Sequence, residues 1–310
     1  MRQVALAFAL LRLGRPHFLA GGVILYNLGA AVALSLGVQL RLPALIWGQL
    51  TITAVQWMTH YSNDYFDLSS DLANVTPTHY SGGSRILVQG RLPPQVALLA
   101  AGLLGASALG AGLVLALVVG TGPLTLPVVL LALMLAWCYS ALPLRLVSRG
   151  LGELVVCFLV PVLTPLFGYY QQTGRLGLPP LLAAGPLVCL QLAMLLGVEY
   201  PDARGDAAVG KRTLVVRLGP ERAARLHVAA LIAAYAVLVP AVALGLPFLV
   251  AVSVLIGAPL AAWQARCLWN RAWCRPESWE GTAARGVLLL AGTAAAELIA
   301  FLWLAASQPG

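Results

Sequence analysis

The chain has 310 residues, of which 60% are hydrophobic and only 10% are charged, with a mean hydropathy of +0.87 and a formal net charge of +8. Soluble domains carry about 25% charged residues, so a chain this poor in charge could not cover a water-exposed surface. The composition excludes an ordinary soluble domain and predicts an all-α polytopic membrane protein.

Apolar runs separated by glycine, proline and arginine predict nine transmembrane helices, each near the ~20 residues that a bilayer requires. The first run follows a charged segment, as in a signal peptide, but it lacks an obvious small-residue cleavage site and we interpret it as a retained helix. We expect residues 1–310 to form a single transmembrane domain. The predicted spans are residues 16–38, 44–63, 94–119, 123–141, 151–172, 179–200, 224–244, 246–269 and 283–305.

Basic residues between the predicted spans indicate orientation. Arg41 and Arg175 fall on one side of the membrane, and the other 17 of the 19 basic residues fall on the opposite side. This asymmetry predicts a cytoplasmic N-terminus and an external C-terminus. The net positive charge is therefore a topology signal, and it indicates no nucleic-acid partner. A composition rich in alanine, leucine, glycine and arginine, with one lysine, favours a prokaryotic inner membrane.

All five aspartates lie in two short stretches, NDYFDLSSD (Asn63–Asp71) and EYPDARGDAAVGK (Glu199–Lys211). Acids at positions 64, 67 and 71 have the same offsets as those at 199, 202 and 206, and on a helix these positions share one face. Both stretches lie at the cytoplasmic ends of predicted spans, the second and the sixth, although Pro201 should bend or restart the second helix. Spans one to four and five to eight could therefore form a pseudo-repeat.

Carboxylates crowded in this way repel one another, and a charge at bilayer depth costs about 2.5–3.5 kcal/mol. Oxygen ligands without histidine or cysteine suit Mg²⁺, which binds through one or two carboxylates together with substrate phosphates. Two facing clusters could hold two Mg²⁺ ions around a diphosphate, with Arg85, Arg91 and the single lysine, Lys211, alongside. The alternatives are solvated charges that cap helix ends and a calcium site, although the spacing does not match an EF-hand loop.

These motifs resemble those of the UbiA-type intramembrane prenyltransferases. NDYFDLSSD matches the NDxxDxxxD signature of that family, and DARGD matches its second DxxxD motif. The similarity extends to RPHFL, SGGSRILVQGRLPP, YSALPLRLVSRGLGELVV and GKRTLVVRLG. The run RGLGELVV…GYYQQTG is most similar to the branch that prenylates 1,4-dihydroxy-2-naphthoate in menaquinone synthesis. Arg145 and Arg149 stand where some members carry lysine.

The resemblance implies a bundle of nine transmembrane helices around a central cavity that opens to lipid. It also implies Mg²⁺-dependent transfer of a polyprenyl group from polyprenyl diphosphate to an aromatic acceptor, with the diphosphate at the cytoplasmic mouth. The implied metal ligands are Asp64, Asp67 and Asp71 for one Mg²⁺, and Asp202 and Asp206 for a second, with Glu199 as a weaker candidate and Mn²⁺ as a possible substitute. The other implied site residues are Arg85 and Lys211 on the diphosphate, then Arg15, Arg91 and Arg145; Asn63 beside the motif or the acceptor; and Tyr139 beside the cation or phosphate.

Several alternatives stay open at this point. The acceptor could instead be a hydroxybenzoate, a homogentisate, a tetrapyrrole or a glycerol-phosphate ether. Broken helices and membrane carboxylates also occur in transporters, and an inactive scaffold could keep the fold. Glu153, His60 and Glu297 are candidate functional residues to which the sequence assigns no role.

Overall fold

The structure of this protein is a computed structural model that describes the backbone of residues 2–307 and the side chains of 6–16 and 18–307. Over that range the chain is helical and has no β-strand. The side chain of Arg2, one of the basic residues behind the predicted orientation, lies outside the described side chains. The α-helices are α1 (Arg2–Leu13), α2 (Pro16–Ser35), α3 (Leu42–Phe66), α4 (Leu68–Ala73), α5 (Pro94–Leu113), α6 (Thr125–Ser140), α7 (Gly152–Phe158), α8 (Thr164–Thr173), α9 (Pro179–Glu199), α10 (Ala203–Ala208), α11 (Leu214–Leu218), α12 (Pro220–Ala236), α13 (Leu238–Ala243), α14 (Phe248–Leu255), α15 (Ala258–Trp269) and α16 (Pro276–Ala306). Two π-helical turns, η1 (Val114–Val119) and η3 (Leu159–Leu163), and two 3₁₀ turns, η2 (Leu146–Arg149) and η4 (Ala272–Cys274), complete the helical elements.

Helix starts follow directly from the sequence. Proline stands in the first turn of α2, α5, α9, α12 and α16, where its fixed φ suits a helix and its missing N–H has no intrahelical partner to lose. Three of the helical elements end at a left-handed glycine, Gly120 after η1, Gly150 after η2 and Gly174 after α8. The prolines and glycines that separate the predicted spans therefore lie at real helix boundaries.

Each of the nine predicted spans coincides with a helix or a bent run of helices. The fifth is α7–η3–α8, the seventh is α12–α13, and the eighth is α14–α15, which bends by 43°. Within residues 2–307, six helices are long and apolar enough to cross a membrane, or seven if the bent pair is one span. Helix α6 is apolar but shorter, and α3 is more polar toward its C-terminal end. The number of nine crossings and the orientation of the N-terminus thus stay predictions.

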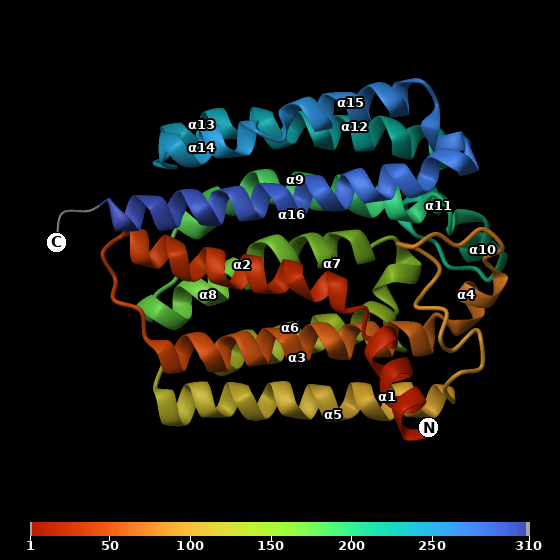
Figure 1. The fold of residues 1–310 in the computed structure, drawn as a ribbon, viewed down its shortest axis with the longest axis horizontal. Coiled ribbons are helices and arrows are strands. Elements are labelled where there is room, and N and C mark those ends of the chain that lie inside the picture. Colours follow the sequence, from red (N-terminus) through yellow and green to blue (C-terminus); the bar gives the residue numbers. More distant parts are fainter. Residues whose placement is uncertain (1, 308–310) are drawn as a thin grey trace.

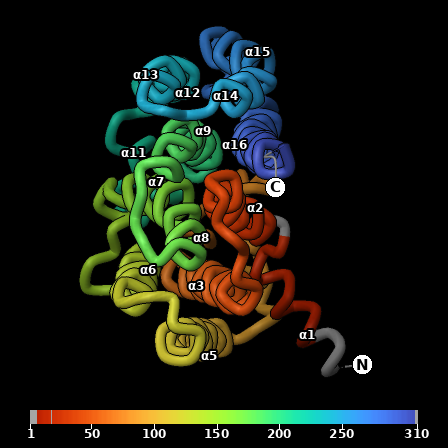
Figure 2. Tube along the Cα trace, turned by 90° about the vertical axis from the view of Figure 1, so that its left-hand side faces the viewer, coloured from red at the N-terminus to blue at the C-terminus, as the bar shows by residue number. Residues whose placement is uncertain are grey.

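The long helices run side by side, and the short helices α4 and α10 lie together at the same end of the bundle (Figure 1). Seen along the helices, α12–α15 lie together on one side, α3, α5 and α6 on the other, and α2, α7, α8, α9 and α16 between them (Figure 2). The middle layer thus brings together helices that are far apart in the chain.

Glycine permits a close crossing in this middle layer, that of α2 with α8. A Cβ on Gly29 would lie 1.9 Å from the Pro165 carbonyl oxygen, and a Cβ on Gly168 would lie 2.1 Å from the Tyr26 carbonyl oxygen. Small residues let helix backbones approach in this way in membrane proteins. The crossing sets the distance between two walls of the cavity described below.

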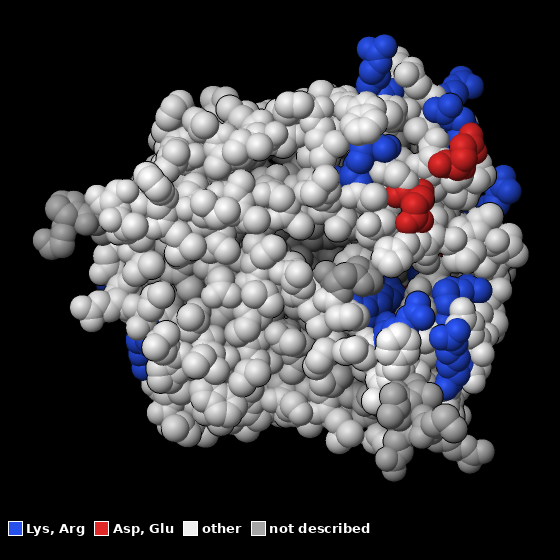
Figure 3. Space-filling model, in the orientation of Figure 1, with Lys and Arg blue, Asp and Glu red and all other residues white. Residues whose placement is uncertain are grey.

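Charged groups gather at one end of the molecule. On the face in Figure 3, acidic and basic side chains cluster at the end that carries α4 and α10, and much of the remaining surface is uncharged. Large apolar side chains such as Leu117, Val118 and Val239 are more than 70% exposed, as suits contact with lipid. Arg41 lies at the opposite end, where its guanidinium donates to the Val119 carbonyl, 2.6 Å away.

Candidate functional site

Each aspartate cluster lies where a long helix ends and a short one begins. Asp64 is in the last turn of α3, Asp67 forms the junction, and Asp71 is in α4. In the second cluster Glu199 ends α9, Asp202 is the junction and Asp206 is in α10. The expectation that the first set shares the face of one helix is wrong, because α3 ends at Phe66, inside the cluster. The break at Pro201 is confirmed.

The two clusters meet although they are far apart in sequence. The Ser70 hydroxyl in α4 donates to the Asp206 carboxylate, 2.5 Å away and 136 residues along the chain. The Asn74 amide donates to Asp202 Oδ1 at 2.6 Å. Two side chains from the segment of the first cluster thus bind carboxylates of the second cluster. These two hydrogen bonds fix α4 against α10.

Two cations, the buried Lys211 and the half-buried Arg15, neutralise the carboxylates. Lys211 Nζ lies 2.8 Å from Asp67 Oδ2 and 3.4 Å from Asp206 Oδ1, so that one ammonium group joins both clusters. Arg15, between α1 and α2, forms an ion pair with Asp64. The Lys211 and Asp67 side chains are only 10% and 5% exposed, so water screens this pair far less than a surface pair.

The loop SGGSR (Ser81–Arg85) closes over both clusters. Gly82 N–H donates to Asp202 Oδ2 at 3.2 Å, and the Ser84 N–H and hydroxyl donate to Asp64. The backbone of Gly83 has φ +73°, and a Cβ there would lie 2.0 Å from Asp71 Oδ2. Glycine is therefore required at position 83 for two reasons, the left-handed backbone and the contact with a carboxylate. Arg85 donates to the Asp71 backbone carbonyl.

Crowding and burial shift the acidity of the carboxyl groups outside the long helices. Burial and the neighbouring Asp64 carboxylate raise the pKa of Asp71 to about 8. Burial and Asp206 raise the pKa of Asp202 to about 6, and burial also raises the pKa of Asp206 although Lys211 opposes this effect. Asp71 therefore holds a proton at neutral pH that a bound cation would displace.

A cavity of about 360 Å³ extends from these clusters into the bundle, between α2, α3, α6, α7, η3, α8, α9 and α16. Arg15, Asn63 and Tyr139 line its charged end, and its other walls are mainly apolar side chains such as Val129 and Phe167. The face in Figure 3 is hollowed near its centre, and lining residues come from α2 and α16, which cross that face (Figure 1). The site is therefore an acidic mouth on an apolar chamber.

The other predicted residues divide into two groups. Asn63 donates to Asp67 Oδ2 and to Ser140 Oγ, both at 2.9 Å, and so orients the first motif. Arg91 is exposed on the surface. Arg145 borders a separate pocket beside Tyr65 and Phe66. Sequence spacing alone did not distinguish these arginines from Arg15 and Arg85.

Glu199 lies with Glu153 in this structure. The two carboxyl groups lie close to each other, Glu153 accepts from the Leu214 N–H at 2.6 Å, and Glu199 accepts from the Val215 N–H at 3.3 Å. The pair therefore caps the first turn of α11. Of the other two unassigned residues, His60 lines the cavity, whereas Glu297 is fully buried in α16.

The donor set is compatible with Mg²⁺ bound jointly with a phosphate ligand. Within the described part of the chain, no three histidine, cysteine, aspartate or glutamate side chains are gathered as a complete metal site. Mg²⁺, however, usually takes one or two protein carboxylates and completes its shell with phosphates and water. Asp67 Oδ1 is buried and has no hydrogen-bond partner among the described residues, which leaves a carboxylate oxygen for a cation.

Ser70, Asn74, Gln56 and Gln191 are site residues that the sequence did not single out. Asn74 belongs to an NVT triplet, which suggests only a chance glycosylation motif, and Ser70 directly precedes a motif aspartate. Their position next to the motif was the available signal. Gln56 and Gln191 line the cavity from the apolar parts of α3 and α9, where each is the rare amide in a hydrophobic run.

Comparison with known proteins places this arrangement in context. A family model described as the UbiA prenyltransferase family matches residues 23–280. An apo UbiA homologue from Aeropyrum pernix K1 is similar in structure, with 18% identity, a TM-score of 0.67 and coverage of 89% of this chain and 96% of that one. A UbiA homologue from Archaeoglobus fulgidus bound to DMAPP and Mg²⁺ has 16% identity, a TM-score of 0.58 and coverage of 91% and 98%. A digeranylgeranylglyceryl phosphate synthase structure has 14% identity, a TM-score of 0.66 and coverage of 96% and 99%. No curated protein matches the chain. At these identities the likeness shows a shared fold.

Proposed function

Since the chain belongs to the UbiA prenyltransferase family, we propose that it transfers a polyprenyl group from polyprenyl diphosphate to an aromatic acceptor in a Mg²⁺-dependent reaction. The observation that carries the proposal is the meeting of the two aspartate clusters at the mouth of an apolar cavity, bridged by Lys211 and by Ser70. The mouth suits a diphosphate with its cations, and the cavity suits a hydrocarbon chain.

Asp64, Asp67 and Asp71 would hold one Mg²⁺, and Asp202 and Asp206 a second, with Mn²⁺ as a substitute. Support comes from the A. fulgidus homologues, whose structures contain DMAPP or GPP with Mg²⁺. When bound, the metal supplies charge that neutralises the departing diphosphate. Glu199 is a weaker ligand candidate because Glu153 and Val215 already engage its carboxyl group.

The protein's own groups would bind and orient the donor. Arg85, Lys211 and Arg15 provide positive charge at the mouth, where the diphosphate leaves as its bond to the allylic carbon breaks. A carbon of the electron-rich ring then bonds to that allylic carbon, and the ring loses a proton, or carbon dioxide in a naphthoate acceptor. Asn63 orients Asp67, Tyr139 faces the reacting end of the cavity, and the apolar walls exclude water.

The first acceptor to test is 1,4-dihydroxy-2-naphthoate, the substrate of menaquinone biosynthesis, because the RGLGELVV and GYYQQTG segments resemble that branch. Hydroxybenzoate, homogentisate, tetrapyrrole and glycerol-phosphate ether acceptors are the alternatives. We further propose nine membrane crossings in a prokaryotic cytoplasmic membrane, with the N-terminus and the site facing the cytoplasm. The asymmetry of basic residues supports this orientation.

The test uses the purified full chain with labelled polyprenyl diphosphate and a panel of aromatic acceptors. We expect Asp64→Asn and Asp202→Asn to lower transfer by about 10²–10³-fold while thermal unfolding stays cooperative, and excess EDTA to abolish transfer. Glu221→Gln is the matched control, since this carboxylate is exposed and lies outside the site. Unchanged turnover in both aspartate variants, or full turnover in EDTA, would refute the assignment.

A further inference from the structure

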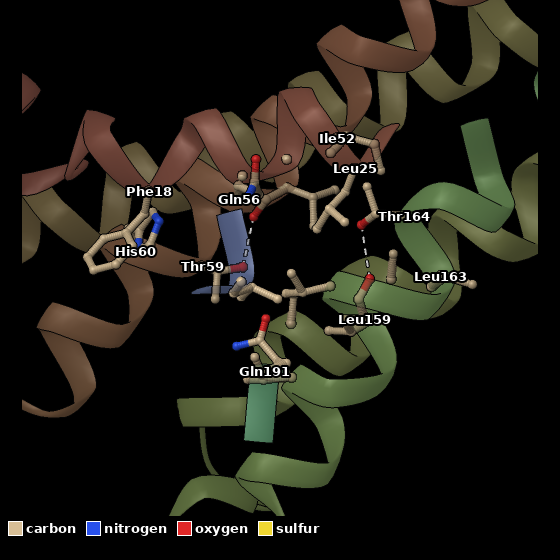
Figure 4. Close-up of a pocket in the computed structure, with 18 of the residues that line it drawn as sticks. Phe18, Leu25, Ile52, Gln56, Thr59, His60, Leu159, Leu163, Thr164 and Gln191 are labelled. Atoms are coloured by element: carbon tan, nitrogen blue, oxygen red, sulfur yellow. Dashed lines mark hydrogen bonds between the residues drawn. The ribbon is translucent and has the colours of Figure 1, made fainter. Parts of the chain in front are cut away.

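Beyond its charged end, the cavity contains two glutamine amides in walls that are otherwise largely apolar. Gln56 comes from α3 and Gln191 from α9, on opposite walls with Thr59 between them (Figure 4). Gln191 is 2% exposed, and the amide oxygens of both glutamines are buried without a hydrogen-bond partner in the described part of the chain. Buried polar atoms of this kind are rare in native proteins, and each requires an explanation.

The space for the Gln56 amide is built into the neighbouring helix. A Cβ on Gly22 of α2 would lie 2.0 Å from Gln56 Oε1 and 2.5 Å from its Cδ. A larger residue at position 22 would displace the amide from this place, since its Cβ would meet the end of the Gln56 side chain. The amide therefore has a fitted place at the edge of the cavity, although it gains no hydrogen bond there from the described residues.

Two threonine hydroxyls near the glutamines have already used their donors. Thr59 donates its hydroxyl proton to the Val55 carbonyl at 2.8 Å, and Thr164 donates to the Leu159 carbonyl at 2.9 Å (Figure 4). Their oxygens can now only accept. Each glutamine amide adds an acceptor oxygen and N–H donors, so the complementary ligand is one with hydroxyl groups, which both donate and accept.

The depth of these groups suits the acceptor. Thr59 lies four residues before Asn63 on α3, and Gln56 lies seven before it, which places them about 6 Å and 10 Å inside the mouth. A small aromatic ring system that extends inward from its reacting carbon at the mouth would reach these depths. A hydrocarbon chain at this level would leave the amide oxygens unpaired.

We propose that Gln56 and Gln191 form a polar subsite that binds the hydroxyl groups of a hydroxylated aromatic acceptor and selects it against an arene without donors. Gly22 is a positioning residue for Gln56. This inference rests on the proposed prenyl transfer for its biological meaning, but binding in the subsite does not depend on turnover.

The experiment measures binding to the full chain in detergent by equilibrium dialysis, without Mg²⁺ or prenyl donor. The probes are 1,4-dihydroxynaphthalene, kept under argon, and 1,4-dimethoxynaphthalene, which has the same ring but no O–H donor. We expect the parent protein to prefer the dihydroxy probe and Gln191→Leu to lower that preference about tenfold. Gln56→Leu and Gly22→Ala should act in the same direction, whereas Gln89→Leu, which alters an exposed glutamine outside the cavity, should leave it unchanged.

Thermal unfolding of the ligand-free variants separates a binding role from a structural one. Leucine removes an unpaired buried amide, so Gln191→Leu should be at least as stable as the parent, whereas a glutamine needed for folding would lower the melting temperature. A parent protein with no preference between the probes, or a preference retained in both leucine variants, would overturn the subsite and indicate that only water or hydrocarbon occupies this level. Preference without prenyl transfer would instead refute the proposed function and leave the subsite standing.

Discussion

Replacement of Lys211 by methionine tests whether one buried ammonium group holds the two aspartate clusters together. Its nitrogen lies 2.8 Å from Asp67 and 3.4 Å from Asp206. At an effective dielectric constant of about 20, these distances correspond to attractions of roughly 6 and 5 kcal/mol. Desolvation of the three groups offsets much of this attraction, and loss of one partner from a buried pair typically costs about 3–5 kcal/mol. We expect Lys211→Met to destabilise the ligand-free protein by about that amount, because two carboxylates are left buried without their cation.

The measurement is chemical or thermal unfolding of purified protein in detergent at neutral pH. Arg225→Met is the matched control, because the Arg225–Glu221 pair is 71% exposed on both sides and a surface pair contributes about 0–1 kcal/mol. Adding Asp67→Asn to Lys211→Met, in a double-mutant cycle, should restore part of the lost stability, since a neutral amide at this position needs no counter-charge. If Lys211→Met costs no more than the control, the ammonium group does not join the clusters energetically and the reasoning is wrong.

Three further outcomes follow from the geometry of the site and of the bundle. The pKa of Asp71 is raised to about 8, and Mg²⁺ requires the ionised carboxylate. The apparent Mg²⁺ affinity should therefore rise from pH 6 to above pH 8 and then level off, as measured by titration with diphosphate present. A flat profile would show that Asp71 does not bind the metal. Gly83→Ala should abolish transfer, since it adds a clash with the Asp71 carboxylate to backbone strain. Gly90→Ala, at φ +65° with open space around it, should show the effect of the strain alone. Equal activity in the two variants would contradict the close contact. Gly29→Ala should lower the melting temperature by separating α2 from α8, and Gly102→Ala, where a Cβ meets nothing within 4 Å, should not; a stable Gly29→Ala protein would contradict the tight crossing.

Much of the fold was accessible from local patterns. Hydropathy and proline positions predicted the helices well, and the start of α5 at Pro94 and of α9 at Pro179 agree with the predicted spans. The end of α16 at Ala306 also agrees, but its start at Pro276 is seven residues before the predicted one, because polar residues in the first turns continue the helix beyond the apolar run. Hydropathy detects contact with lipid and is insensitive to a helix that extends into water.

The shape of the aspartate clusters was less accessible. Equal spacing correctly indicated two related clusters. Of the helix breaks at Asp67 and Asp202, only the second was predicted, from Pro201. In the first cluster no proline marks the break. There the chain turns from α3 into α4, which packs against α10 through Ser70 and Asp206, a contact that periodicity cannot detect.

By itself the sequence determined the class of protein, the two acidic motifs and the family, because composition and spacing are properties of neighbouring residues. Only the tertiary structure decided that Arg15 rather than Arg91 pairs with the first motif, that Lys211 joins both motifs, and that two glutamines face the cavity. The contacts of Arg15 and Lys211 join residues 49 and 144 positions apart. Their existence depends on how the helices pack, and packing is set by the sum of many weak contacts that no local pattern contains.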